Sequence, residues 1–534
     1  MNFVFLKNNK IQLLLFLGTF LLLFLTYQYP VILSIRPESI HQWRQTVCTS
    51  ITLNYYQHGM NFMMPEVHHL FSDGGKSGQS LAELPIVYYF NALLWKIFGA
   101  HESISRIVNI LICLLGALYL FKLVSRILSP SWALMITLLL FTSPVIAFYG
   151  FGFMVDVPAL FICFISAYYF LNYYEFGKAK DFYAFLLISL LVMLLKVTVG
   201  IFFLSTFGIF VFEKLKILKF NRVIFQNALR DGLSFIIVLL LIVAWYSYAI
   251  HFDTIHGGWY TINDIFPIWT LDAEGIKTVF IHFFEMPFYQ FFLPASTFIF
   301  LLLFFAFIMI YKKIDRFYLV LTLFLILGAF AYAILWFKVW DVHDYYLFLF
   351  LLPLVFIFLS VGDWLKKNYP SIFYSTKSKL LFGVFLIFNI WYCSNNIRMR
   401  YNISTTKIPY LSTKAEMDMW NWFHWNYSNT LKPLETMEVY NRSIGITDND
   451  PVISIPDQSI CITLYLMNQK GWTDYGNHFY EQDDIAEKIK MGAKYLILND
   501  STHASNPFIN AYTKHKIGQH KNIQIYDLRE FSAK

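Results

Sequence analysis

The chain has 534 residues, of which 57% are hydrophobic and only 14% are charged, and its net charge is +7. Soluble proteins carry about 25% charged residues, so this composition excludes a soluble globular enzyme and indicates a polytopic membrane protein. The modest positive charge is typical of basic loops beside anionic lipid, and it gives no reason to expect nucleic-acid binding.

Hydrophobic segments recur along the first three quarters of the chain. A bilayer is crossed by about 17–25 apolar residues in a helix, because every backbone polar group must be hydrogen-bonded within the segment. On this rule the sequence predicts an α-helical membrane protein with eleven spans. They lie near residues 11–33, 106–128, 132–150, 155–174, 181–196, 197–213, 232–251, 291–311, 317–336, 345–362 and 379–396.

The first span, 11–33, follows Lys7 and Lys10, as the apolar region of a signal peptide would. It is too long for one and lacks a small-residue cleavage site, so we expect a retained anchor. With the N-terminus inside, the inside loops hold more than twice as many lysines and arginines as the outside loops before residue 397. The positive-inside rule therefore predicts a cytoplasmic N-terminus, and the odd number of spans places the C-terminus outside.

A long outside loop, about residues 34–106, contains the segments "RPESIHQWRQ" and "ELPIVYYFNALLWKIFG". Connectors are usually a few residues long, and longer ones tend to be functional. Within this loop, residues 38–58 and 82–98 mix aromatic and polar groups, which predicts two helices lying along the membrane surface. The outside loop 252–290, with "HGGWYTINDIFPIWT", is also rich in aromatic residues, and we expect it to line or cover a site.

From about residue 397 the composition becomes that of a soluble domain. "DPVISIPD", "GAKYLILND" and "KNIQIYDL" predict short buried strands, and "EQDDIAEKIKMG" predicts a helix that ends at Gly492. Strands that alternate with helices indicate a small α/β domain over residues 397–534, outside the membrane, after a transmembrane domain over residues 1–396.

Three ionisable side chains of the long loop have a helical spacing. Glu38, His41 and Arg44 are three positions apart in turn, which would place them on one face of a surface helix. A carboxylate there could act as a general base, and a neighbouring cation could stabilise a phosphate leaving group. A salt-bridged surface helix without any chemistry explains the same spacing.

Further ionisable residues fall at the same membrane–water boundary. Placing a charge there costs free energy unless the group is paired or faces water. These residues are Glu83, Asp156, Lys196, His343 and Asp344. Asp156 precedes Pro158, so it is expected either to cap a helix or to face a ligand. Lys196 either snorkels to the membrane surface or binds an anionic headgroup. His343 and Asp344 precede "YYLFLFLLP", which is typical of an interfacial tyrosine belt as well as of a site.

Two patterns could suggest a metal. "DND" at Asp448–Asp450 matches the acidic motif with which sugar-nucleotide enzymes bind a divalent cation, but "DNDP" before a strand is a turn signature. The five cysteines are scattered, with no CxxC pair and no Cys/His cluster, so the sequence predicts neither a structural zinc site nor a disulfide framework.

Several of these segments together resemble one family. A basic start, a single span and then a loop with "HQWRQ" and "ELPIVYYFNALLWKIFG" are similar to the GT-C glycosyltransferases. The likeness is to bacterial members of the protein-mannosyltransferase and aminoarabinose-transferase type, the family 39-like and 83-like group. "FMVDVPALF", "HDYYLFLFLLP" and the tail segments "VISIPD" and "GAKYLIL" also resemble that group, so the likeness runs over most of the chain.

The resemblance implies an enzyme of the bacterial inner membrane that takes a sugar from a polyprenyl-phosphate donor. The acceptor would be a lipid, a glycan or a protein at the periplasmic face, and the reaction would invert the sugar carbon with a carboxylate as general base. The resemblance assigns the catalytic carboxylates to Glu38, Glu83 and Asp156. It assigns the donor phosphate to Arg44, His41, Lys196 and His343, with Trp43, Gln45, Asp344, Tyr345 and Tyr346 lining the site.

The chain departs from the family pattern at one point. Relatives have an aspartate early in the first loop, some just after "WRQ", where this chain has "TVCT" and no aspartate before Asp73. A divalent cation is left open, with Glu83 and Asp156 as acids beside it. Two other functions also stay open: a transporter or flippase of lipid-linked glycan, and an inactive scaffold whose outer domain binds glycan. A transport pathway would need ionisable residues through the spans, whereas here they cluster on one side.

Overall fold

The computed structural model describes residues 9–256, 265–403, 412–477, 479 and 484–533. The chain divides into two compact units, which we call the helical unit and the α/β unit. The helical unit comprises Met1–Ser34, Arg106–Trp245 and Ile265–Met417, and the α/β unit comprises Ile35–Ser105, Tyr246–Asp264 and Asp418–Lys534. Part of the aromatic loop that we expect to cover a site, residues 257–264, lies outside the described residues.

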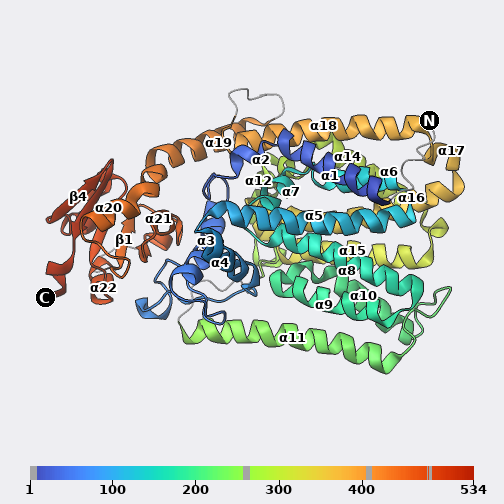
Figure 1. The fold of residues 1–534 in the computed structure, drawn as a ribbon, viewed down its shortest axis with the longest axis horizontal. Helices are drawn as coiled ribbons and strands as arrows, with labels where there is room; N and C mark the ends of the chain where they lie inside the picture. The colour runs from blue at the N-terminus through green and yellow to red at the C-terminus, as the bar shows by residue number, and fades with distance from the viewer. Residues whose placement is uncertain (1–8, 257–264, 404–411, 478, 480–483, 534) are drawn as a thin grey trace. The chain divides into compact units, whose positions relative to one another are not determined.

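The helical unit is a bundle of long apolar helices, with α18 along one edge and α11 along the opposite edge (Figure 1). Its main helices are α1 (Asn9–Thr26), α5 (Glu102–Ile127), α6 (Pro130–Leu140), α7 (Pro144–Gly150), α8 (Asp156–Phe176), α9 (Ala179–Leu195), α10 (Ile201–Lys214), α11 (Ala228–Ile255), α14 (Pro294–Met309), α15 (Arg316–Leu335), α16 (Leu351–Asn368) and α18 (Thr376–Arg400). Shorter helices link them: α2 (Tyr29–Ile32), α12 (Ala273–Glu285), α13 (Pro287–Phe291) and α17 (Pro370–Phe373).

The bundle confirms a polytopic α-helical membrane protein. Among the described residues, seven helices are long and apolar enough to cross a membrane, or eight if α6 and α7 form one bent span. The bend is 77°, and it falls at residues 141–143, directly before Pro144, which cannot donate a backbone hydrogen bond to the preceding turn. The other three expected spans coincide with α1, α9 and α14, which are helices of 16 to 18 residues.

The α/β unit combines two helices of the long loop, α3 (Gln42–Gln57) and α4 (Ile86–Phe98), with the tail. The tail adds α19 (Lys414–Asn426), whose first residues up to Met417 belong to the helical unit, and α20 (Met437–Ser443), α21 (Ile462–Leu466), α22 (Asp484–Lys490) and α23 (Pro507–Asn510). Its sheet has strands β1 (Val452–Ile455), β2 (Gly471–Thr473), β3 (Tyr495–Leu498), β4 (Lys516–His520) and β5 (Ile523–Asp527).

The strand order is β2-β1-β3-β5-β4, with β1 parallel to β2 and β3, and β5 antiparallel to β3 and β4. The predicted strands β1, β3 and β5 and the predicted helix α22 are confirmed. Strands β2 and β4 were not predicted, because β2 has only three residues and β4 alternates between exposed and half-exposed positions.

A segment of the long loop adds itself to the edge of this sheet. Leu70 N donates to Gly471 O at 2.7 Å, and Gly471 N donates to His68 O at 3.0 Å. The contact makes a short parallel bridge beside β2. A Cβ atom at Gly471 would overlap the backbone of Val452, so only glycine fits at this position of β2. The long loop and the tail therefore form one compact unit.

Candidate functional site

The helical unit brings Asp156 and Lys196 together at two helix ends. Asp156 is the first residue of α8, and Lys196 lies in an extended break between α9 and the short 3-10 turn η3 (Val197–Gly200). Lys196 Nζ lies 2.6 Å from Asp156 Oδ1, and the two side chains are 13% and 1% exposed. The N-cap of α8 is Val155, so the capping interpretation of Asp156 is wrong and its carboxylate binds the lysine instead.

Two tyrosines complete the surroundings of this lysine. Lys196 Nζ lies 5.4 Å from the ring centre of Tyr346 and 6.0 Å from that of Tyr345. The half-buried ring of His343 packs edge-on against the same two rings, at 5.7 and 5.9 Å. Three of the predicted regions, at 156, at 196 and at 343–346, thus converge on one cluster with a cation, a carboxylate and an imidazole.

Asp344 belongs to a buried network beside this cluster. Its carboxylate accepts hydrogen bonds from Tyr149 Oη and from Arg400 Nη2, each at 2.6 Å, and Asp344 and Arg400 are fully buried. Arg400 Nη2 also donates to Gln290 Oε1 at 2.6 Å. These bonds hold the start of the 3-10 turn η7 (Asp344–Phe350) against α7, α13 and the end of α18, so Asp344 supports the site rather than facing a ligand.

The network extends to Glu416 near the start of α19. Gln290 Nε2 donates to the Glu416 carboxylate, and Thr413 N donates to Glu416 Oε2 at 2.8 Å. Glu416 N donates back to Thr413 Oγ1 at 3.1 Å, which makes a reciprocal capping box. Burial raises the pKa of Glu416 to about 7, although the bonds from Thr413 oppose that rise.

Arg400, Gln290 and Glu416 were not anticipated as part of the site. "TKAE" is a recognisable capping-box signature, and an arginine in the last turn of an apolar span is itself a signal. Neither signal identifies the partner, because Gln290 lies 110 positions from Arg400 and 126 from Glu416.

An apolar cavity of about 520 Å³ begins beside Lys196, between α10 and α15. Val197 and Thr198, the next residues after the lysine, line one part of it, and Leu327, Gly328 and Tyr332 line another. Tyr332 Oη donates to Tyr346 O at 3.3 Å, which links the wall of the cavity to the tyrosine beside Lys196. The arrangement offers an elongated apolar ligand a channel with a cation near one end.

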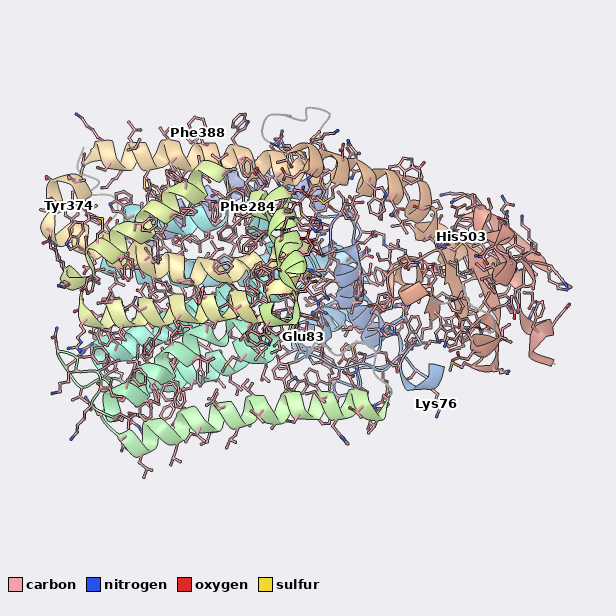
Figure 2. The ribbon with its side chains drawn as sticks, turned by 180° about the vertical axis from the view of Figure 1, so that it is seen from behind. Lys76, Glu83, Phe284, Tyr374, Phe388 and His503 are labelled. Carbon is pink, nitrogen blue, oxygen red and sulfur yellow. The ribbon has the colours of Figure 1, made fainter. Side chains whose placement is uncertain are left out.

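The α/β unit holds the other predicted residues. Arg44 of α3 and Glu83, which precedes α4, form a close ion pair whose side chains are 12% and 11% exposed. Tyr88 Oη donates weakly to Glu83 Oε1 at 3.5 Å. The side chain of Glu83 can be followed in Figure 2. Trp43 is 37% exposed, and its ring lies 5.5 Å from that of Tyr475.

The predicted row of Glu38, His41 and Arg44 on one helical face is wrong. Helix α3 begins at Gln42, and Ser39 and His41 adopt left-handed backbone angles, with φ of 71° and 52°. Glu38 and His41 therefore lie in a turn. Buried Gln45 holds that turn by donating from Nε2 to the backbone oxygens of Glu38 at 3.0 Å and Ile40 at 2.9 Å.

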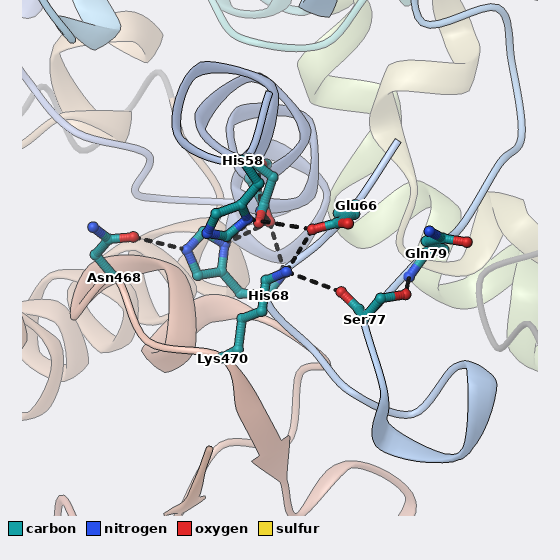
Figure 3. Close-up of polar contacts among 9 residues, drawn as sticks. His58, Glu66, His68, Ser77, Gln79, Asn468 and Lys470 are labelled. Atoms are coloured by element: carbon teal, nitrogen blue, oxygen red, sulfur yellow. Dashed lines mark hydrogen bonds and ion pairs between the residues drawn. The ribbon is translucent and has the colours of Figure 1, made fainter. Parts of the chain in front are cut away.

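Another polar cluster of the α/β unit joins the long loop to the tail (Figure 3). Glu66 accepts from Lys470 Nζ at 2.5 Å and lies 3.3 Å from His58 Nδ1. His68 Nδ1 lies 2.7 Å from Ser50 Oγ, and its Nε2 lies 3.1 Å from Asn468 Oδ1. Burial lowers the pKa of His68 to about 3, so the ring is neutral at physiological pH and the cluster is a structural junction.

Within the described residues, no group of three or more His, Cys, Asp or Glu side chains is placed to hold a metal ion. The turn interpretation of "DND" is confirmed. Asp450 Oδ2 accepts from Thr447 N at 2.7 Å and from Thr447 Oγ1 at 2.8 Å, which closes the turn before β1.

Comparison with known proteins gives one family match and several matches of fold. A family model described as dolichyl-phosphate-mannose-protein mannosyltransferase matches residues 82–248. Searching curated proteins finds no match.

Two of the similar solved structures are of ArnT from Cupriavidus metallidurans. The apo structure has 10% identity and a TM-score of 0.54, over 96% of this chain and 97% of that chain. The structure bound to undecaprenyl phosphate has 11% identity and a TM-score of 0.56, over 97% and 98%. The Archaeoglobus fulgidus oligosaccharyltransferase complex with Zn and sulfate has 13% identity and a TM-score of 0.53, over 92% and 71%. At these identities the likeness is one of fold.

Proposed function

We propose that this chain, which has the fold of the GT-C membrane glycosyltransferases, transfers a sugar from a polyprenyl-phosphate donor to a hydroxyl or amide acceptor. Family match and fold together indicate a GT-C glycosyltransferase. The finer proposal is supported by the Lys196–Asp156 pair, because Lys196 directly precedes Val197 and Thr198, which line the 520 Å³ apolar cavity. In this arrangement the apolar cavity would bind the lipid chain, and the lysine next to it would bind the phosphate.

The donor lipid would lie in the cavity between α10 and α15. An isoprenoid chain needs an apolar channel, and the lining of this cavity is almost entirely apolar. Lys196 Nζ would receive the phosphate, since an ammonium group near an apolar wall attracts an anion strongly in a low-dielectric setting. The solved ArnT structure with undecaprenyl phosphate supports a lipid of this class.

Lys196 would also assist the reaction itself. An acceptor heteroatom attacks the anomeric carbon, the bond from that carbon to the phosphate oxygen breaks, and polyprenyl phosphate leaves with the bonding electrons. A cation already held at the phosphate stabilises the charge that develops on the leaving oxygen. Asp156 keeps the lysine in place, because a carboxylate 2.6 Å away fixes an otherwise flexible side chain.

A carboxylate would take the proton from the acceptor, with inversion at the sugar carbon. Glu38 and Glu83 are partly exposed and so are open to an acceptor from water, whereas Asp156 is 1% exposed. This difference favours Glu38 or Glu83 as the general base and Asp156 as a positioning residue. Arg44 would orient Glu83 through their ion pair, and His343, whose ring packs on those of Tyr345 and Tyr346, would contact the donor phosphate.

The proposed location is a bacterial inner membrane, with the N-terminus in the cytoplasm and the α/β unit in the periplasm. The distribution of lysine and arginine over the loops supports this orientation. The donor would then enter sideways from the lipid, and a lipid, glycan or protein acceptor would come from the periplasmic side.

The test is sugar transfer in nanodiscs with labelled polyprenyl-phosphate sugars. Glu38→Gln, Glu83→Gln and Asp156→Asn are compared with wild type, and exposed Glu274→Gln is the matched control. We expect one of the first two variants to lose transfer while still binding donor. If wild-type protein transfers from no donor but moves lipid-linked glycan across the bilayer, the chain is a transporter. Glycan binding with neither activity would make it a scaffold.

A further inference from the structure

A second cavity, of about 320 Å³, lies in the helical unit between the end of α1 and about the last four turns of α18. Its lining residues are Thr26, Ile387, Ile390, Trp391, Ser394, Asn395 and Arg398. In the part of the chain that the structure describes, it shares no lining residue with the 520 Å³ cavity between α10 and α15. We call it the α18 groove.

The lining of the α18 groove changes from apolar to cationic along the helix axis. The six α18 positions recur at intervals of three and four, so they form one stripe on one helical face. Ile387 and Ile390 stand at one end, and Arg398 stands at the other, 11 residues further on. At 1.5 Å per residue the stripe is about 16 Å long, close to the depth of one leaflet's hydrocarbon layer.

The apolar end of the groove is open and the polar end is partly closed. Ile387 is 65% exposed and Trp391 is 40% exposed. Neighbouring Phe388, labelled in Figure 2, is 53% exposed on the same helix. Ser394 Oγ donates to Thr26 O at 3.0 Å, which fixes α18 to the end of α1 and closes the back of the groove.

Arg398 differs from the other arginine at this helix end. Arg400, two residues later, is fully buried and donates to Asp344, Gln290 and Asn396. Arg398 faces the groove, and within the described residues its Nε is buried and has no hydrogen-bond partner. Burying a donor of a charged group without a partner costs free energy, and among the described residues no acidic side chain lines this groove. An anion placed there would remove that cost.

We propose that the α18 groove binds an anionic phospholipid of the leaflet that contains the C-terminal end of α18. The lipid phosphate accepts hydrogen bonds from the Arg398 guanidinium, and one acyl chain lies along Ile390 and Ile387, with Trp391 at the level between them. The length of the stripe matches one acyl chain, and the charge matches one phosphate. This site is separate from the proposed donor cavity and does not depend on transfer activity.

Native mass spectrometry of the full chain, released from detergent with added lipid, tests this proposal. The probes are phosphatidylglycerol and phosphatidylcholine with equal chains. We expect the wild type to retain phosphatidylglycerol preferentially, and Arg398→Gln to weaken its binding by about tenfold. Lys377→Gln, which removes one exposed positive charge at the opposite end of α18, should bind as the wild type does. Arg398→Lys should retain part of the preference.

Ile387→Asn tests the acyl-chain end at an exposed position that the fold does not need. It should weaken binding of phosphatidylglycerol but not reverse the preference over phosphatidylcholine. Equal retention of phosphatidylglycerol by Arg398→Gln and by the wild type would overturn the proposal. So would competition by inorganic phosphate as effective as by the lipid, which would make the site one for free anions, or tighter binding of polyprenyl phosphate, which would make it part of the donor path.

Discussion

At the residue scale, the helical unit pairs each anticipated ionisable group with a partner that the sequence could not specify. The sequence predicts Asp156 as a helix cap or a ligand-facing acid, and Lys196 as a snorkelling or headgroup-binding lysine. Their 2.6 Å contact joins the start of α8 to the break after α9. Residue type and position at the water boundary predict both side chains as site candidates, whereas the contact that joins them lies between residues 40 positions apart in sequence.

Lys196→Gln should lower kcat/KM for transfer by about 100-fold, because it removes the cation that would hold the leaving phosphate. Asp156→Asn should lower it less, since the lysine remains but loses its anchor. The double variant should be little worse than Lys196→Gln, as residues in contact are not additive. Steady-state transfer in nanodiscs measures all three, with exposed Lys338→Gln as control. A Lys196→Gln enzyme with unchanged kcat/KM would contradict the assignment.

Glu416 gives a prediction about pH. Burial raises its pKa to about 7, above the value of an exposed glutamate, so the folded protein favours the protonated form. The folded state is therefore more stable near pH 5, and this contribution is lost as the pH rises through about 7. Glu416→Gln should remove that dependence, raising the melting temperature at pH 8 by roughly 1–3 °C. Melting curves at pH 5 to 8 check this, with exposed Glu274→Gln as control, which should keep the wild-type profile.

At the element scale, length and local pattern were strong guides. Long apolar runs predicted the main helices, and short segments typical of buried strands predicted β1, β3 and β5. The turn at residues 38–41 was not predicted. Ser39 and His41 adopt left-handed backbone angles, which are usually predicted from a glycine, and this segment contains none. Strand β2 was missed for a related reason: three residues carry no periodicity, and its pairing with residues 68–70 is set by backbone contacts about 400 positions apart in sequence.

Gly471→Ala tests that pairing. A Cβ at this position would overlap the backbone of Val452, so either β1 and β2 separate or the bridge to residues 68–70 breaks. We expect a loss of roughly 2–4 kcal/mol in stability, seen as a lower melting temperature and lower yield. Gly383→Ala in α18, where no atom lies within 4 Å of an added Cβ, should change neither. An unaltered melting temperature for Gly471→Ala would show that the strand edge can shift at little cost.

At the scale of the whole molecule, the long loop and the tail form one compact unit. Sequence composition separates a hydrophobic part from a soluble tail, because composition reports burial in lipid or in water. It does not report which soluble segments pack on one another. The α/β unit takes residues 35–105 from between the first spans and combines them with residues 418–534. The positions of Arg44 and Glu83 therefore depend on the folding of both the loop and the tail.

The junction in Figure 3 makes this joint support measurable. Lys470 binds Glu66 across 404 positions of sequence and also donates to Ser77 O at 2.9 Å. Lys470→Gln should leave the helical unit unchanged but raise amide hydrogen exchange of residues 66–80 about five- to tenfold, since the opening free energy of this segment falls. Lys516→Gln, on exposed β4, is the matched control. If exchange in 66–80 does not respond, the parallel bridge at Gly471 holds the loop without the lysine, and the ion pair contributes nothing measurable to the unit.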